Sequence, residues 1–210
     1  MVKYGYYYAG GLLAGAAAIT YLTRWPFALP FYILAAFCLN FFRDPERRVP
    51  DGDVAVSPAD GKVVGVRTNP PELSRISIFM NIFDVHVNRA PIAGRISCVQ
   101  YKKGEFLAAN REPASEANEQ NVVSIEGVVN GSRTTVVVKQ IAGLIARRII
   151  CYKGVGDRVA AGERIGLIKF GSRVDVLLGP EWDITAKPGE KLAAGSSVIA
   201  RLAVARETAA

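Results

Sequence analysis

The sequence predicts a mainly β domain preceded by an N-terminal α-helical hairpin. Three features of the chain support this fold class. Residues 4–42 are mostly apolar, residues 43–50 are charged and marked by prolines, and the chain after Asp53 consists of short apolar runs separated by turn-forming residues. A chain of 210 residues is long enough for one such domain together with an anchor. We therefore expect an anchor at residues 1–42, a linker at 43–52 and a β-rich domain at 53–210.

The apolar N-terminal region predicts two helices that form a hairpin in a membrane. Its halves, residues 9–23 and 27–42, each approach the ~20 residues that a spanning helix needs. A secretory signal is disfavoured because the region is too long and ends in bulky aromatic residues and Arg43 rather than in a small-residue cleavage site. A buried helical hairpin of a soluble protein remains the alternative.

Basic residues at both ends of the hairpin predict its orientation. Lys3 precedes the first helix, and Arg43, Arg47 and Arg48 follow the second. Basic residues near membrane segments favour the cytoplasmic side. We therefore expect the protein at the cell membrane, with the β-rich domain on the cytoplasmic side.

Short alternating segments predict the strands of the second domain. The dipeptide Asn130-Gly131 between two apolar runs is typical of a tight β-hairpin. Residues 109–121 bury almost nothing and are expected to form an exposed loop, and no stretch within 51–210 predicts a helix. The predicted strands are residues 54–57, 62–67, 75–80, 84–88, 94–101, 122–126, 133–140, 165–170 and 173–178.

Two closely spaced turn-and-strand units, residues 156–159 and 162–166, follow the pattern of a known small β architecture. Together with SPADGKV at residues 57–63 they resemble the barrel-sandwich hybrid fold that lipoyl and biotinyl carriers share. The resemblance implies a compact sandwich of short strands.

Composition limits the classes of function. The net charge of +7 suits nucleic acid or an anionic membrane surface, and no nucleic-acid-binding motif is present, so a membrane partner is favoured and no nucleic acid is expected. The three cysteines have no paired spacing, which suits a reducing compartment, and no metal site is expected. The chain has one histidine, so any imidazole chemistry must use His86.

The dipeptide Gly195-Ser196 offers a second kind of chemistry, because a chain can cut itself at a Gly-Ser bond. The serine hydroxyl attacks the preceding carbonyl and forms an ester, and glycine leaves that carbonyl unhindered. Elimination of the ester converts the serine to dehydroalanine, which hydrolyses to a pyruvoyl group. A turn before a last strand is the simpler interpretation of the same residues.

Ser196, His86 and Asp60 are side chains of the types that serve as nucleophile, base and orienting group, in that order. Ser196 must lose a proton to attack Gly195, and His86 can accept a proton near neutral pH. Asp60 lies in the turn Pro58-Ala59-Asp60-Gly61, from which its carboxylate can orient the imidazole. We expect these three side chains to be catalytic.

Six motifs occur in an order that resembles the phosphatidylserine decarboxylase family, in its short bacterial and archaeal form. The resemblance covers nearly the whole chain. The motifs are SPADGKV at 57–63, FMNIFDVHVNRAP at 79–91, ASEANEQN at 114–121, QIAGLIARRI at 140–149, FGSRVD at 170–175 and GSSVI at 195–199.

The resemblance implies self-cleavage between Gly195 and Ser196 into a large chain, 1–195, and a small chain, 196–210, which stay together as a heterodimer. It implies a pyruvoyl group derived from Ser196 as the covalent cofactor, with no metal. The implied reaction is decarboxylation of phosphatidylserine to phosphatidylethanolamine. Anionic membrane lipid is expected as a further partner. A homo-oligomer is an open alternative to a single heterodimer. Longer members carry two histidines three residues apart, where this chain has His86 and Arg89. Both proton-transfer roles are therefore assigned to His86.

Other functions stay open at this point. The chain could be a membrane-tethered carrier or adaptor without catalysis, a phosphocarrier with His86 as its acceptor, or a pyruvoyl decarboxylase of a soluble amino acid. A decarboxylase of a related serine phospholipid would use the same headgroup chemistry. Uncut protein would favour the carriers, whereas self-cleavage would favour the decarboxylases.

Overall fold

The computed structural model describes residues 1–68, 73–109, 113–144, 148–169 and 171–203. The chain divides into two compact units. The first unit holds Met1–Glu46 with Phe83–Val85, and the second holds Arg47–Ile82 and the chain from His86 onward.

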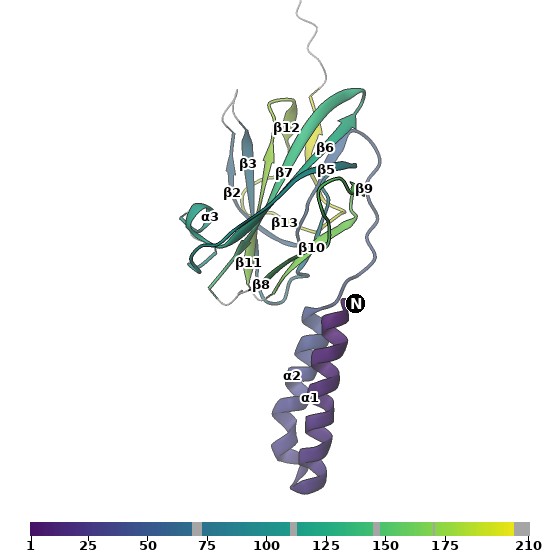
Figure 1. Cartoon of the computed structure of the whole chain (residues 1–210), viewed down its shortest axis with the longest axis vertical. Coiled ribbons are helices and arrows are strands. Elements are labelled where there is room, and N and C mark those ends of the chain that lie inside the picture. The colour runs from purple at the N-terminus through teal and green to yellow at the C-terminus, as the bar shows by residue number, and fades with distance from the viewer. Residues whose placement is uncertain (69–72, 110–112, 145–147, 170, 204–210) are drawn as a thin grey trace, which may run out of the picture. The chain divides into compact units, whose positions relative to one another are not determined.

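The first unit is a helical hairpin, as the sequence predicts. Helix α1 spans Lys3–Leu22 and helix α2 spans Trp25–Phe41 (Figure 1). Both helices bury alanines, which are Ala9 and Ala16 in α1 and Ala28 and Ala35 in α2. Small side chains let two helices approach closely, which explains how so alanine-rich a pair forms a hairpin.

The outer surface of the hairpin carries large apolar side chains. Tyr21 is 89% exposed, and Tyr7, Leu22, Trp25 and Phe27 are also exposed. Neither helix, nor any other in the described ranges, combines the length and the hydropathy of a membrane-crossing segment. The location of the hairpin in a membrane stays a prediction.

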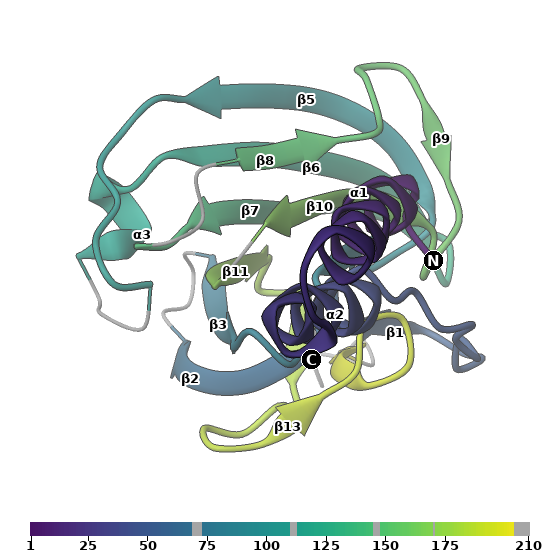
Figure 2. The ribbon, with the colours of Figure 1, turned by 90° about the horizontal axis from the view of Figure 1, so that it is seen from below.

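The second unit is built on an antiparallel sheet of eight strands in the order β13-β2-β3-β11-β7-β6-β5-β9. Figure 2 shows that this sheet curls from β5 and β6, through β11, to β2 and β13. Its strands are β2 (Gly61–Arg67), β3 (Ser74–Met80), β5 (Gly94–Lys102), β6 (Gln120–Val129), β7 (Ser132–Ala142), β9 (Arg158–Val159), β11 (Ser172–Leu178) and β13 (Lys191–Leu192).

Two sheets of three strands complete this unit. In the first, strand β14 lies between β1 and β12, and in the second, β10 lies between β4 and β8. The bounds are β1 (Val54–Val56), β14 (Val198–Leu202), β12 (Trp182–Ile184), β4 (Val87–Arg89), β10 (Arg164–Lys169) and β8 (Arg148–Cys151).

One face of the curled sheet carries the hydrophobic core. Val176 lies between Ile76 and Val138 on the neighbouring strands, and Val174 lies beside Ile78. All five side chains are fully buried. Each such side chain contributes roughly 1.5–3 kcal/mol through its burial. The mainly β fold class is therefore confirmed.

The hairpin predicted from Asn130-Gly131 is confirmed by strands β6 and β7. Asn130 has φ +47° and Gly131 has φ +76°, the left-handed pair that a two-residue hairpin turn requires. The predicted strand at residues 84–88 is displaced, because β4 begins at Val87 and His86 precedes it.

The predicted exposed loop at residues 109–121 is wrong over most of its described part. A short helix, α3, spans Ala114–Ala117, and β6 begins at Gln120, so the expectation of no helix in this unit is wrong as well. Ser115 and Asn118 are buried because they make tertiary hydrogen bonds, which polarity alone does not reveal. Residues 110–112 of this segment, residues 145–147 and 170 of the motifs, and residues 204–210 of the predicted small chain lie outside the described residues.

Candidate active site

The turn between β13 and β14 contains the predicted cleavage site. The carbonyl of Ala193 accepts hydrogen bonds from the amides of Ser196 (3.1 Å) and Ser197 (3.0 Å). The hydroxyl of Ser197 accepts a further hydrogen bond, from the Ala193 amide, at 2.9 Å. These bonds close a tight turn in which Gly195 adopts φ +73°, a conformation that favours glycine.

Ser57 attaches this turn to the rest of the unit. Its carbonyl accepts a hydrogen bond from the Gly195 amide (2.7 Å), and its amide donates one to the Ser197 carbonyl (2.8 Å). The backbone on both sides of the Gly195–Ser196 bond is therefore fixed. No hydrogen bond of the Ser196 hydroxyl is seen within the described residues, and Ser196 is only half-buried.

Asp60 holds the residue that precedes Gly195. One carboxylate oxygen of Asp60 accepts a hydrogen bond from the amide of Ala194 at 2.8 Å. The guanidinium of Arg47 binds the same carboxylate at 2.7 and 3.0 Å. Both side chains are largely shielded, with 18% of Arg47 and 15% of Asp60 exposed. A charged acceptor makes the bond to Ala194 a strong one.

Arg89 lies against Gly195 itself. A Cβ atom added to Gly195 would lie 2.9 Å from the Cδ atom of Arg89 and 3.4 Å from the Cα atom of Gly162. The Arg89 guanidinium donates a hydrogen bond to the carbonyl of Gly162 at 3.0 Å. A side chain at Gly195 would therefore force Arg89 to shift, and glycine leaves its own carbonyl unhindered.

His86 is fully buried and precedes strand β4. Its Nε2 atom accepts a hydrogen bond of 3.4 Å from the amide of Gly171, and its carbonyl accepts one from the amide of Ile168. A nitrogen that accepts carries no proton, so the neutral imidazole has its proton on Nδ1. Nε2 is the atom that could take up a proton.

The structure brings together some of the predicted catalytic residues and not others. Asp60 is joined to the backbone beside Ser196 through Ala194. Within the described residues, the hydrogen bonds of Asp60 go to Arg47 and Ala194, and none goes to His86. The catalytic roles of the three residues stay predictions.

Strand β4, which connects His86 to Arg89, is fixed by a chain of buried amides. Asn121 donates to Gln140 at 2.9 Å, and Gln140 donates to Asn88 at 2.8 Å. These residues come from β6, β7 and β4. A bonded buried network is rigid, so it holds the β4 backbone between His86 and Arg89 in place.

Residues of two further motifs, 114–121 and 170–175, meet in a second buried network. The Arg173 guanidinium binds Asp175 at 2.6 Å and the hydroxyl of Ser77 at 2.6 Å. Ser115 of helix α3 donates to the other oxygen of Asp175. These bonds attach α3 to the sheet, which gives these motif residues a structural role. Ser172, the residue before Arg173, has a buried hydroxyl without a partner among the described residues.

Glu163 and Lys153 form an ion pair next to Gly162. Their charged atoms are 2.5 Å apart. The pKa of Glu163 lies below its ordinary value because its carboxylate accepts hydrogen bonds from Lys153 and from the amide of Ala160. The Glu163 carboxylate therefore remains charged at neutral pH.

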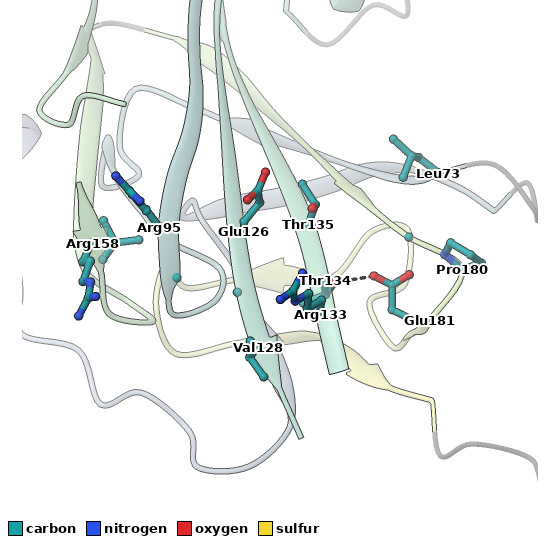
Figure 3. Close-up of a pocket in the computed structure, with 14 residues that line it drawn as sticks. Leu73, Arg95, Glu126, Val128, Arg133, Thr134, Thr135, Arg158, Pro180 and Glu181 are labelled. Carbon is teal, nitrogen blue, oxygen red and sulfur yellow. Dashed lines mark hydrogen bonds between the residues drawn. The ribbon is translucent and has the colours of Figure 1, made fainter. Parts of the chain in front are cut away.

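A cavity of about 990 Å³ lies elsewhere on the curled sheet, and Figure 3 shows its lining. Its charged side chains are Arg95, Arg133, Arg158, Glu126 and Glu181. None of the predicted catalytic residues lines it. No group of three potential metal ligands occurs among the residues that the structure describes.

The chain is similar in sequence to proteins of one known family. The phosphatidylserine decarboxylase family profile matches residues 34–200. The chain is 61% identical over 203 residues to a phosphatidylserine decarboxylase proenzyme of Solibacter usitatus (strain Ellin6076), covering 96% of each chain. It is 45% identical over 181 residues to a protein of the same name from Saccharopolyspora erythraea, covering 81% of this chain and 75% of the relative.

Proposed function

Since the chain belongs to the phosphatidylserine decarboxylase family, we propose that it cuts itself between Gly195 and Ser196 and then converts phosphatidylserine to phosphatidylethanolamine. The observation that carries this proposal is the 61% identity to a named proenzyme over nearly the whole of both chains. The geometry of the β13–β14 turn supports it, because glycine at a left-handed position precedes a serine whose backbone is fixed. The chain is therefore an enzyme of the carboxy-lyase class.

The two products of cleavage remain bound to one another. The small chain, 196–210, contains β14, which pairs with β1 on one side and with β12 on the other. A central strand keeps two ladders of hydrogen bonds after the peptide bond to Gly195 is broken. Residue 196 consequently stays at the site where it was formed.

Ser196 provides the oxygen that attacks the Gly195 carbonyl. The ester that results is eliminated, which leaves a carboxylate on Gly195 and, after ammonia is released, a pyruvoyl group at residue 196. The residues present fit this group, since Gly195 opens the carbonyl to attack and Ser196 supplies the carbon atoms. The pyruvoyl group supplies an electron sink that lets the carboxylate of a serine headgroup leave as CO₂.

Asp60 orients the bond that is cut. Its hydrogen bond to the Ala194 amide fixes the segment before Gly195, and Arg47 binds the same carboxylate. This places Asp60 one residue from the reacting carbonyl. Its role in the proposal is to position the backbone at the cleavage site.

His86 transfers the protons. Its Nε2 atom carries a lone pair in the neutral form, so it can accept the Ser196 proton during self-cleavage and later protonate the decarboxylated headgroup. Histidine suits both steps because it ordinarily changes charge near neutral pH. The buried amide chain through Asn88 holds the adjoining strand in place for this role.

The helical hairpin keeps the enzyme at the cytoplasmic face of the cell membrane. Lys3 is the only charged residue within α1 and α2, and aromatic side chains cover much of their exposed surface. Aromatic side chains of this kind favour the interface between lipid and water. A lipid substrate would reach such an enzyme without leaving the bilayer, and the excess of basic residues would favour anionic lipid.

Incubation with vesicles that contain phosphatidylserine tests the proposed reaction. The purified wild type should form phosphatidylethanolamine, whereas Ser196→Ala should remain one chain and form none. Vesicles with a phosphatidylcholine headgroup serve as the substrate control. Turnover by the uncut Ser196→Ala variant would rule out the pyruvoyl mechanism, and a cut wild type without turnover would rule out this substrate.

A further inference from the structure

The turn between strands β3 and β4 carries an exposed aromatic side chain close in sequence to His86. Phe83 is 64% exposed, and its neighbour Ile82 is 37% exposed. Within three residues of Phe83 the chain passes from the surface to the interior, since Val85 is 3% exposed and His86 is fully buried. Contact of adjacent apolar side chains with water is unfavourable, and an exposed apolar patch commonly marks a surface that binds a partner.

This turn is attached to the end of the helical hairpin. The guanidinium of Arg43 donates a hydrogen bond to the carbonyl of Phe83 at 2.6 Å. The same guanidinium donates to the carbonyl of Asn40 at 2.8 Å and to its side-chain oxygen at 3.1 Å, near the C-terminus of α2. Phe83–Val85 accordingly belong to the same compact unit as the hairpin. The exposed Phe83 side chain therefore lies at the end of the hairpin where α2 finishes.

The residues at this end of the hairpin are of the kinds that gather at a lipid–water interface. Ring centroids lie 6.4 Å apart for Tyr4 and Phe42, and 5.5 Å apart for Tyr8 and Phe42. Lys3 precedes this cluster in the sequence, and Arg43 follows it. Aromatic rings concentrate where the hydrocarbon of a bilayer meets its headgroups, and basic side chains there favour anionic lipid. An anionic bilayer surface is thus the partner that fits the exposed turn.

We propose that Phe83 and Ile82 insert into the interface of an anionic bilayer, and that this contact holds the substrate headgroup within reach of His86. The inference rests on the proposed reaction at a membrane and adds a second membrane contact close to a reacting group. Three residues of extended chain span at most about 11 Å, which limits the distance between the Cα atoms of Phe83 and His86. A headgroup layer is roughly 5–8 Å thick on each side of a bilayer. Insertion of Phe83 therefore brings His86 to the level of the headgroups.

Tryptophan fluorescence tests the insertion without any turnover. Phe83→Trp is made in a Trp25→Phe background, so that Trp182, which is 4% exposed, is the one native tryptophan left. The probe is a vesicle of equal parts phosphatidylcholine with brominated acyl chains and phosphatidylglycerol, neither of which carries a serine headgroup. Bromine quenches the tryptophans that it contacts. The control is Val155→Trp in the same background, because Val155 is 67% exposed and lies in a turn of the second unit.

The tryptophan at position 83 should be quenched by these vesicles, and the one at position 155 should not. Absence of quenching at position 83, or equal quenching at both positions, would overturn the proposal. An emission shift of Phe83→Trp that follows protein concentration and ignores the vesicles would overturn it too, because the turn would then contact a second copy of the chain.

Turnover separates a membrane contact from a structural role. Phe83→Ser should raise KM for phosphatidylserine in vesicles roughly 10-fold and change kcat less than about twofold, because the lost contact contributes to binding. With short-chain phosphatidylserine dispersed below its micelle concentration, the variant should match the wild type. Phe83→Leu keeps an apolar side chain and should retain most of the affinity for vesicles. Val155→Ser should match the wild type on both substrates.

The two substrates also decide against the proposal if it is wrong. An equal loss on vesicles and on dispersed substrate would overturn the inference, because a ring that only packs within the protein does not distinguish them. A loss in Phe83→Leu as large as that in Phe83→Ser would overturn it as well. A wild type that converts neither substrate would overturn the proposed function, and the quenching experiment would still decide whether Phe83 enters the bilayer.

Discussion

Substitution of Gly195 by alanine tests whether the turn geometry matters in the way described above. Two physical costs are expected at this position. An alanine at φ +73° costs roughly 1–2 kcal/mol, as any L-residue does in a left-handed conformation. Its Cβ would also lie 2.9 Å from the Arg89 Cδ atom, and overpacking of this kind typically costs about 1–3 kcal/mol.

Gly189 provides the matched control for the first cost. It has φ +89°, and a Cβ there would meet nothing within 4 Å. Gly189→Ala should therefore lose only about 1–2 kcal/mol, whereas Gly195→Ala should lose about 2–5 kcal/mol. Both are compared in the Ser196→Ala background, so that cleavage does not enter the comparison.

Denaturant unfolding, followed by the fluorescence of Trp182 in the core, gives the free energy of unfolding of each variant. In the background with Ser196 intact, Gly195→Ala should also cut more slowly, because the added methyl group hinders attack on the carbonyl of residue 195. Equal destabilisation by the two alanines would refute the packing described at Gly195. Cleavage of Gly195→Ala at the wild-type rate would refute its link to the reaction.

Three further predictions concern charged and titrating side chains. Asp60→Asn should slow self-cleavage and destabilise the uncut chain by about 1–3 kcal/mol, since it leaves Arg47 without a charged partner. A cleavage time course and denaturant unfolding measure the two effects. Wild-type values in both measurements would contradict the role of Asp60. His86→Gln should leave the chain uncut and inactive on phosphatidylserine, as judged by mass and by lipid analysis, and normal cleavage in this variant would remove His86 from the first step. The lowered pKa of Glu163 means that its ion pair with Lys153 stabilises the fold above about pH 4.3, the value of a free glutamate, and that this contribution is lost as pH falls through the lowered pKa. Because 38% of the Glu163 side chain is exposed, Glu163→Gln should cost below about 1 kcal/mol at pH 7 and nothing at pH 2, and a larger loss at low pH would contradict the sign.

Local signals were sufficient for much of the fold. Asn130-Gly131 predicted the β6–β7 hairpin because only a few residues tolerate two consecutive left-handed positions. The apolar residues before Arg43 predicted the helical hairpin, which the structure contains. The short strands β12 and β13 had no such signal, since three and two residues are too few to show a period.

Tertiary hydrogen bonds account for the segment that was predicted wrongly. Residues 114–121 are polar and looked exposed, yet Asn118 donates to the carbonyls of Leu107 and Ala142 and is fully buried. Burial of a polar side chain depends on partners from distant parts of the chain. Composition does not contain that information.

The candidate site shows the same limit. The need for a nucleophile, a base and an orienting group pointed to Ser196, His86 and Asp60 as candidates, but not to the partner of Asp60. Arg47 lies in a charged stretch that was interpreted as a linker, and only the folded chain places its guanidinium on Asp60. Arg89 was noticed as a departure from the family pattern, and its position against Gly195 required the structure.

The intact mass of the purified protein under denaturing conditions shows directly whether the chain cuts itself between Gly195 and Ser196. Two species are expected, one ending at Gly195 and one beginning with a pyruvoyl group in place of Ser196. Ser196→Ala should give a single full-length species under the same conditions. A wild type that remains one full-length chain while converting phosphatidylserine to phosphatidylethanolamine would contradict the account.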